Sequence, residues 1–312
     1  MFKDTGKFFA GAAVFLALIV AATFYFKNEY VFFAGYVVLQ FVVLATAWNI
    51  LGGYAGYVNF GAAAFFAIGA YTGVFLFKWA GAPIVLQIVA GALVAGLLGL
   101  AVGVLTLRLR GIYFSIATVA LSIVLETVVV NWTFVGGAKG LPIERPPNVT
   151  LFPSYLTWVF FLMAVIVVVA LFAARYVERG WIGRGLRAIR DNEEAAECSG
   201  VPTMRLKIFA ATLSGALMGA AGAPFAQYLS FIEPASTFSL NYAFSALAMP
   251  IIGGMHHWLG PVIGAVLLAT VQQLVTVTIS SELNVLVVGL LLVVFVVVAP
   301  DGILGLLRRK RP

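Results

Sequence analysis

The amino-acid sequence predicts an all-α integral membrane protein, a polytopic bundle of about ten transmembrane helices in which glycine-rich stretches break some helices. Three observations lead to this fold class. Of the 312 residues, 62% are hydrophobic and only 10% are charged. Apolar runs of about 20 residues, the length that crosses a bilayer, follow one another along the chain. Paired glycines interrupt the pattern once in each half. A composition this apolar excludes an ordinary soluble globular protein.

The predicted crossings are the apolar runs in chain order. They lie near residues 8–26, 31–51, 60–77, 84–107, 112–133, 155–174, 207–229, 261–279 and 284–300, with a shorter run at 240–252. We count the short run as a crossing, which makes ten, and we expect residues 1–312 to form a single transmembrane domain. The first run lacks a clean small-residue cleavage site, so an uncleaved helix is expected there rather than a signal peptide.

The distribution of Lys and Arg predicts the orientation. Fifteen of the 19 basic residues fall at the amino terminus, at Arg108 and Arg110, within 175–207 and at 308–311. The positive-inside rule then predicts a multi-pass membrane protein with both termini in the cytoplasm. The same bias explains the net charge of +7. The basic residues are spread over several loops, so no nucleic-acid partner is expected.

The only long polar segment, residues 178–207, is predicted to be a cytoplasmic loop of two short helices. The first covers Arg184 to Arg190 and leaves Leu186 and Ile189 on a separate side. Asp191 is expected to cap the second helix, with Glu194 closing a capping box. Gly200 and then Pro202 supply a left-handed stop. A bent helix pair of this kind is typical of a surface that docks a partner.

Two glycine-rich stretches interrupt the predicted spans. The first includes Gly52, Gly53, Gly56, Gly61 and Gly69, and the second runs from Ile251 to Leu268 with a new helix beginning near Pro261. Irregular backbone at membrane depth survives only inside protein or beside a water-filled cavity. The stretches therefore indicate either broken helices around a translocation path or close packing through small residues. The residues alone favour neither interpretation.

Several blocks of the sequence resemble a known family. Glu194-Ala195-Ala196 followed by Gly200 is similar to the EAA loop of ABC-importer permeases, and GRGLRAIRDNEEAAECSGV resembles its form in the branched-chain amino-acid permeases, the LivH/LivM family. The resemblance extends from about residue 35 to 307 and is closer to the LivM type. The other matching blocks are Trp48 to Gly56, Gly69 to Tyr71, Arg110 to Phe114, Asn131-Trp132, Gly136-Gly137, Gly140-Leu141, Gly253 to Met255, Gly260-Pro261 and Pro300 to Leu304.

The resemblance implies an ABC-importer permease fold and a transport subunit that hydrolyses nothing itself. It implies cytoplasmic ATP-binding subunits that carry ATP and magnesium, a periplasmic solute-binding protein acting near 134–153 and 230–239, and a second permease subunit of the same family, related or identical. The residues expected to couple to the ATPase are Arg184, Arg187, Arg190, Asp191, Glu194, Ala195, Ala196 and Gly200. Those expected along the translocation path are Tyr54, Tyr57, Asn59, Phe60, Gly61, Phe65, Tyr113, Phe114, Gly253 and Gly254.

Departures from the family pattern leave the solute open. Tyr57, Asn59 and Ala62 stand where the family often has Gln, Ser and His, and His256-His257-Trp258 follow the second glycine pair. The expected solute is therefore a branched-chain or related amino acid, with urea, a short amide or an aromatic carboxylate as alternatives. Buried amides such as Gln272 and Gln273 are expected to join helices rather than bind solute.

Other function classes have less support in the sequence. A stand-alone secondary transporter or channel would depend on Glu126, the one clearly intramembrane acid. The sequence has no GxxxxGK[ST] phosphate loop and no HExxH motif, so neither ATP hydrolysis nor metalloprotease chemistry is expected on this chain. Adjacent histidines point about 100° apart on a helix, so no metal site is expected at His256 and His257.

Overall fold

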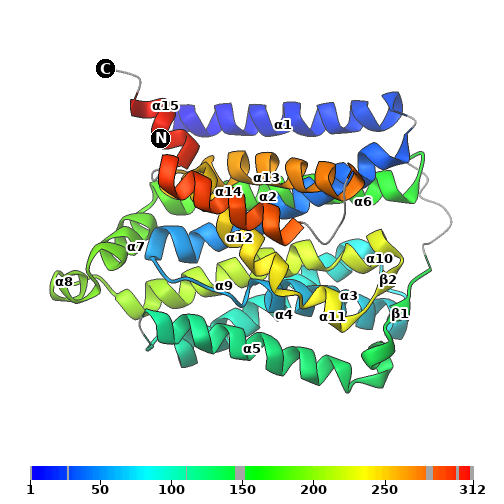
Figure 1. The fold of residues 1–312 in the computed structure, drawn as a ribbon, viewed down its shortest axis with the longest axis horizontal. Coiled ribbons are helices and arrows are strands. Elements are labelled where there is room, and N and C mark those ends of the chain that lie inside the picture. The colour runs from blue at the N-terminus through cyan, green and yellow to red at the C-terminus, as the bar shows by residue number, and fades with distance from the viewer. Residues whose placement is uncertain are drawn as a thin grey trace.

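The computed structural model describes residues 2–26, 28–109, 111–144, 152–278, 284–299 and 302–309, and most of them are helical (Figure 1). Arg110, Pro300 and Asp301 of the family-like blocks, and residues 145–151 of the predicted outer loop, lie outside the described residues. The long helices run side by side along one direction, as the apolar runs predict.

The element bounds follow the predicted runs closely. The amino-terminal half contains α1 (Phe2–Tyr25), α2 (Glu29–Ala55), α3 (Ala62–Ala80), α4 (Ile84–Thr106), α5 (Ile112–Val130), the 3-10 turns η1 (Thr133–Val135) and η2 (Gly137–Lys139), and β1 (Leu141–Pro142). The remainder contains α6 (Tyr155–Arg179), α7 (Trp181–Asp191), α8 (Glu193–Cys198), α9 (Thr203–Gly222), α10 (Phe225–Leu229), β2 (Phe231–Ile232), α11 (Pro234–Thr237), α12 (Leu240–Gly253), α13 (Gly260–Thr278), α14 (Asn284–Val298) and α15 (Gly302–Arg309).

The predicted crossing at 240–252 is confirmed in its placement, as α12, but the span is longer than the sequence indicated. Within the described ranges, nine helical stretches are long and apolar enough to span a membrane, and one of them is the 20-residue stretch Pro234–Gly253. Pro234 begins the short helix α11 and the Ser239 side chain caps α12, so residues that look like a loop in the sequence form the first part of this span. The shorter apolar helix is instead Leu286–Phe295, within α14.

Helix α2 is the centre of the bundle. Every residue from Val42 to Ala55 is buried, and α2 packs against α6, α9, α12 and α13. Helix α1 lies along one edge of the molecule and α5 along the opposite edge (Figure 1). One face of α5 remains exposed, including Ile116 at 59% and Val124 at 58%. The described core is therefore concentrated around the second span.

Small residues allow several helices to approach closely. Helices α3, α4 and α9 meet at Gly69, Gly91 and Gly219, and a Cβ placed on Gly219 would lie 2.5 Å from the Gly91 carbonyl oxygen. Helices α12 and α13 cross at Gly253, Gly260 and Gly264, where an added Cβ would overlap the backbone of the facing helix. This is the small-residue packing that membrane helices use to bring their backbones together.

Both glycine-rich stretches contain a non-helical segment. The first break, residues 56–61, joins α2 to α3, and the second break, residues 254–259, joins α12 to α13. Backbone groups of the first break are bonded by side chains: Thr118 Oγ1 accepts from Phe60 N at 3.1 Å, and Ser115 Oγ donates to Val58 O at 2.9 Å. Trp48 Nε1 donates to Asn59 O at 2.8 Å. Side chains thus supply partners that helical geometry would otherwise provide.

The two ends of the bundle differ in character. Helices α7, α8 and α15 and the beginning of α1 lie at one end in Figure 1, and α8 extends furthest from the bundle. The opposite end carries α10, α11 and the antiparallel pair β1 and β2, in which Leu141 pairs with Ile232. The positions of α1 and α15 agree with an even number of crossings.

We expect Gly264→Ala to lower the free energy of unfolding by about 1–3 kcal/mol, the usual cost of overpacking, because its Cβ would overlap the Met249 carbonyl oxygen where α13 crosses α12. Chemical unfolding in detergent micelles measures the change. Gly11→Ala is the matched control, since no atom lies within 4 Å of a Cβ added on α1 there. Equal stability of the two variants would contradict the close crossing.

Candidate functional site

The polar loop folds into a bent helix pair, α7 and α8, which we call the docking pair after the role that the sequence predicts for it. Leu186 and Ile189 are buried on one side of α7, as the arginine spacing predicts, whereas Arg184 is exposed. Arg187 Nη2 donates to Glu178 O at 3.3 Å and Arg190 Nη1 to Gly53 O at 3.2 Å. Two of the three predicted docking arginines therefore attach α7 to the ends of α6 and α2.

The start of α8 corrects the predicted capping box. Asp191 is the last residue of α7, and Asn192 caps α8 by accepting from Ala195 N at 3.0 Å. Asn192 is extended, with φ −163°, so the helix bends one residue later than the sequence pattern indicated. Glu194 and Ala195 are exposed on α8, and Ala196 is buried. An asparagine cap satisfies the same free N–H groups as an aspartate cap.

The end of α8 confirms the predicted left-handed stop. Gly200 has φ 82°, its N–H donates to Glu197 O at 2.9 Å, and Val201 N donates to Ala196 O at 3.0 Å. These two bonds form a Schellman motif, which requires a residue that tolerates positive φ. The short helix thus has a defined beginning and end, and it presents a fixed exposed surface.

A buried ion pair attaches the docking pair to the bundle. Lys207 Nζ on α9 lies 2.6 Å from Glu193 Oε1 on α8, with the two side chains 3% and 13% exposed. Lys207 also donates to Leu107 O at 2.9 Å and to the Tyr57 hydroxyl at 3.1 Å. Removing one partner of such a pair typically costs about 3–5 kcal/mol, because the other charge is left buried and uncompensated.

The structure does not gather the predicted path residues around one cavity. Tyr54, Asn59, Phe65 and Phe114 are buried in helix packing, and Phe114 stacks edge-on against Tyr57 at 5.3 Å between ring centroids. Tyr113 is 72% exposed on α5. The remaining members lie in or beside the two breaks: Tyr57, Phe60 and Gly61 in the first, Gly254 in the second, and Gly253 as the last residue of α12.

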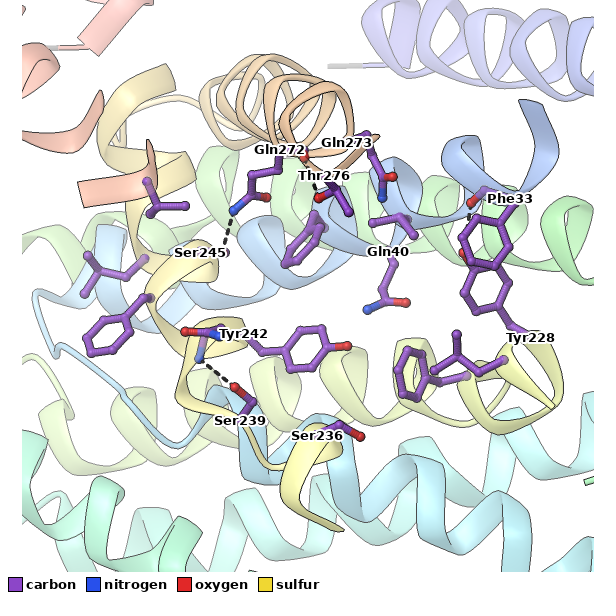
Figure 2. Close-up of a pocket in the computed structure, with 18 of the residues that line it drawn as sticks. Phe33, Gln40, Tyr228, Ser236, Ser239, Tyr242, Ser245, Gln272, Gln273 and Thr276 are labelled. Atoms are coloured by element: carbon purple, nitrogen blue, oxygen red, sulfur yellow. Dashed lines mark hydrogen bonds between the residues drawn. The ribbon is translucent and has the colours of Figure 1, made fainter. Parts of the chain in front are cut away.

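A cavity of about 660 Å³ lies instead between α2, α10, α12, α13 and α14 (Figure 2). Aromatic side chains form much of its wall, and Phe244 connects it to the first break through an edge-on contact with Phe60 at 5.9 Å. The lining residues on which the argument depends are Phe33, Gln40, Tyr228, Tyr242, Phe244, Ser245, Gln272, Gln273 and Thr276. Among the described residues, its lining contains no Asp, Glu, Lys, Arg or His.

Polar groups in the cavity come from helices on opposite walls. Figure 2 shows Gln40 of α2 pointing toward Tyr242 of α12, with Gln272 and Gln273 on the far wall. Gln272 Nε2 donates to Ser245 Oγ at 3.3 Å, so Gln272 does join helices as expected. Within the described part of the chain, the amide oxygens of Gln40 and Gln272 are buried without a hydrogen-bond partner. Each of these oxygens is an acceptor that lacks a donor.

Sequence reasoning missed the residues that organise these sites. Gln40 was one amide within a long apolar span, and its role depends on helices more than 200 residues away. Lys207 gave a better signal, since a lysine at the beginning of an apolar span requires a partner when buried. No cluster of three His, Cys, Asp or Glu side chains that could hold a metal ion occurs in the residues that the structure describes.

Comparisons with known proteins show that this chain is similar to permease proteins of amino-acid transport systems. The LivM permease proteins of the high-affinity branched-chain amino acid transport systems of Salmonella typhimurium and Escherichia coli are 30% and 29% identical to this chain, covering 86% of it and 68% of their own length. A probable LivH permease of Methanocaldococcus jannaschii is 27% identical over 79% of this chain and 82% of its own. No solved structure matches the chain significantly.

The family described as "Branched-chain amino acid transport system / permease component" matches residues 30–296, which reach from the first turn of α2 into α14 and include the docking pair and the whole cavity lining. The spans found in the structure agree with a multi-pass membrane protein. The chain therefore belongs to the family of branched-chain amino acid transport permeases.

Proposed function

We propose that this chain is the permease subunit of an ATP-binding-cassette importer and that a separate ATPase docks on α7 and α8. The observation that carries the proposal is the docking pair itself, a short, capped and exposed helix pair attached to a permease bundle by a buried ion pair. ATP and magnesium belong to the partner, because this sequence has no phosphate-binding loop. Exposed Arg184, Glu194 and Ala195 and the left-handed Gly200 shape the contact surface.

The proposed orientation is that of a bacterial inner-membrane protein with both termini in the cytoplasm. The docking pair, α15 and the beginning of α1 share one end of the bundle, and most of the Lys and Arg residues lie in the segments around them. The opposite end, with β1, β2, α10 and α11, then faces the periplasmic solute-binding protein. A second permease of the same family completes the path, as a related subunit or an identical one.

The proposed solute is a branched-chain or related amino acid, or another small organic compound of similar size, and the 660 Å³ cavity lies on its route. The aromatic wall fits an apolar side chain, and the buried amide oxygens of Gln40 and Gln272 accept from donor groups. Typical small-molecule sites combine these features, an apolar wall with few polar groups. The same lining also accommodates a short amide or an aromatic compound, the alternatives that the departures from the family's sequence pattern left open.

The alternative of a stand-alone carrier depends on Glu126. This carboxylate is partly exposed on α5, at the edge of the bundle rather than beside the cavity. Proton or sodium coupling uses intramembrane charges that face a pathway. No specific observation favours the carrier.

We expect an ATPase encoded beside this chain to co-purify with it, and Gly200→Val to reduce the co-purified amount, because valine does not tolerate a φ of 82°. Gly81→Val is the matched control: Gly81 is also left-handed, with no atom within 4 Å of an added Cβ, but it ends α3. Quantitative mass spectrometry of the purified complexes gives the result. If the chain purifies alone and transports solute without ATP, it is a stand-alone carrier and not an importer subunit. Glu126→Gln then becomes the informative variant.

We expect Gln272→Leu and Gln40→Leu each to lower uptake of radiolabelled leucine by roughly tenfold, the effect of losing about one hydrogen bond to the solute. Both substitutions keep the side chain close to its native size and remove the buried amide. The control is co-purification of the ATPase, which should remain at the wild-type amount. Unchanged uptake in both variants would remove the cavity from the leucine route.

A further inference from the structure

The docking pair and the two breaks are far apart in the sequence, yet the structure brings them to the same end of the bundle. Each break is connected to the polar loop by a different carboxylate. Glu193, on α8, contacts the first break, and Glu178, in the last turn of α6, contacts the second. Neither residue stood out in the sequence, because each is one acid among several in a polar segment.

The first link is a closed triangle of charged and polar groups. Tyr57 of the first break donates to Glu193 Oε2 at 2.6 Å, while Lys207 Nζ contacts Glu193 Oε1 at 2.6 Å and the Tyr57 hydroxyl at 3.1 Å. Charge-assisted bonds of this kind are shorter and stronger than neutral ones. Because the ion pair is largely buried, solvent screens it little. Displacement of α8 therefore displaces Tyr57.

The second link uses a backbone donor. Trp258 N, in the second break, donates to Glu178 Oε2 at 2.5 Å, and the Tyr54 hydroxyl donates to the same oxygen at 3.3 Å. The Glu178 carbonyl accepts from Arg187 of α7 at 3.3 Å. The second break is also attached to α2, since Asn49 Nδ2 donates to Met255 O at 3.1 Å. Glu178 therefore connects the Trp258 amide to the residue at which Arg187 attaches α7 to α6.

The breaks are suited to respond to such displacements. Segments without regular helical hydrogen bonds absorb changes of φ and ψ more readily than packed helices do, and hinges commonly occur there. The first break reaches the cavity through Phe60 and Phe244. The second precedes α13, which supplies Gln272 and Gln273 to the same cavity. Both links therefore lead from the docking surface toward the proposed solute site.

We propose that Glu193 and Glu178 are positioning residues that transmit movement of the docking pair to the first and second breaks, respectively. This inference rests on the proposed docking of an ATPase at α7 and α8. Neither carboxylate touches the solute or the nucleotide. Each holds one irregular segment in register with the docking pair, so that movement of that pair during the ATP cycle changes the conformation of both segments.

The test measures the two breaks separately, without knowledge of the solute. Val58→Cys reports on the first break, where Val58 is 37% exposed, and His256→Cys reports on the second, where His256 is also exposed. In both labelling variants Cys198 is replaced by Ser, because it is an exposed free cysteine on α8 that maleimide would also label. Maleimide labelling rates are compared with and without a non-hydrolysable ATP analogue and magnesium, on the purified complex with its ATPase.

In the otherwise native complex, the analogue should change both labelling rates by roughly fivefold or more, the lower end of ordinary coupling between sites. Glu193→Gln should abolish the change at position 58 and preserve it at 256, and Glu178→Gln should do the reverse. Tyr57→Phe, which removes only a hydroxyl, should behave like Glu193→Gln. A general loss of structure would not produce this crossed pattern. Glu29→Gln, the same change at the opposite end of α2, should preserve both responses.

Responses that persist in both Gln variants, or that are absent from the native complex, would overturn the inference while leaving the ATPase docking intact. Absence of a co-purifying ATPase from the native complex would contradict the proposed function, and the inference would fall with it. Retention of the ATPase by every variant, read by mass spectrometry, separates these two failures.

Discussion

Backbone groups that leave helical geometry inside an apolar bundle must find other partners, and this constraint organises the molecule. The first break meets it through Trp48, Ser115 and Thr118, which reach its carbonyl and amide groups from α2 and α5. The second break meets it through Glu178 and Asn49. Side chains on the surrounding helices are therefore needed to hold both breaks, and these side chains determine where each break can lie.

Glycine has two different roles in this chain. At Gly253, Gly260 and Gly264 it allows α12 and α13 to cross with their backbones in contact, where no side chain fits. At Gly200 it allows a left-handed residue that ends α8 in open space. The sequence left two interpretations of the glycine-rich stretches, close helix packing and broken helices, and both can hold for the same stretch. The second stretch packs tightly through its glycines and still contains a non-helical turn at 254–259.

The docking pair shows how a polar surface is held rigid at the end of an apolar bundle. Burial of Leu186 and Ile189 fixes the face of α7, and its two inward arginines bond to carbonyl oxygens where α2 and α6 end. The buried pair of Glu193 and Lys207 does the same for α8. Arginines that read as docking charges in the sequence mostly anchor the pair, which leaves Arg184 on the outside. An anchored element of this kind suits the proposed docking of an ATPase.

The sequence alone determined the class of protein, the positions of most spans, the helix pair at 184–200 and its left-handed end, because these depend on composition, periodicity and local cap chemistry. The tertiary structure decided what depends on distant partners. It moved the cap from Asp191 to Asn192, and it extended the 240–252 span by building polar residues into α11 and α12. It also joined Gln40 to Gln272 in one cavity and Glu193 to Tyr57 in one network. Partners separated by more than a hundred residues leave no local pattern, so only the fold brings them together.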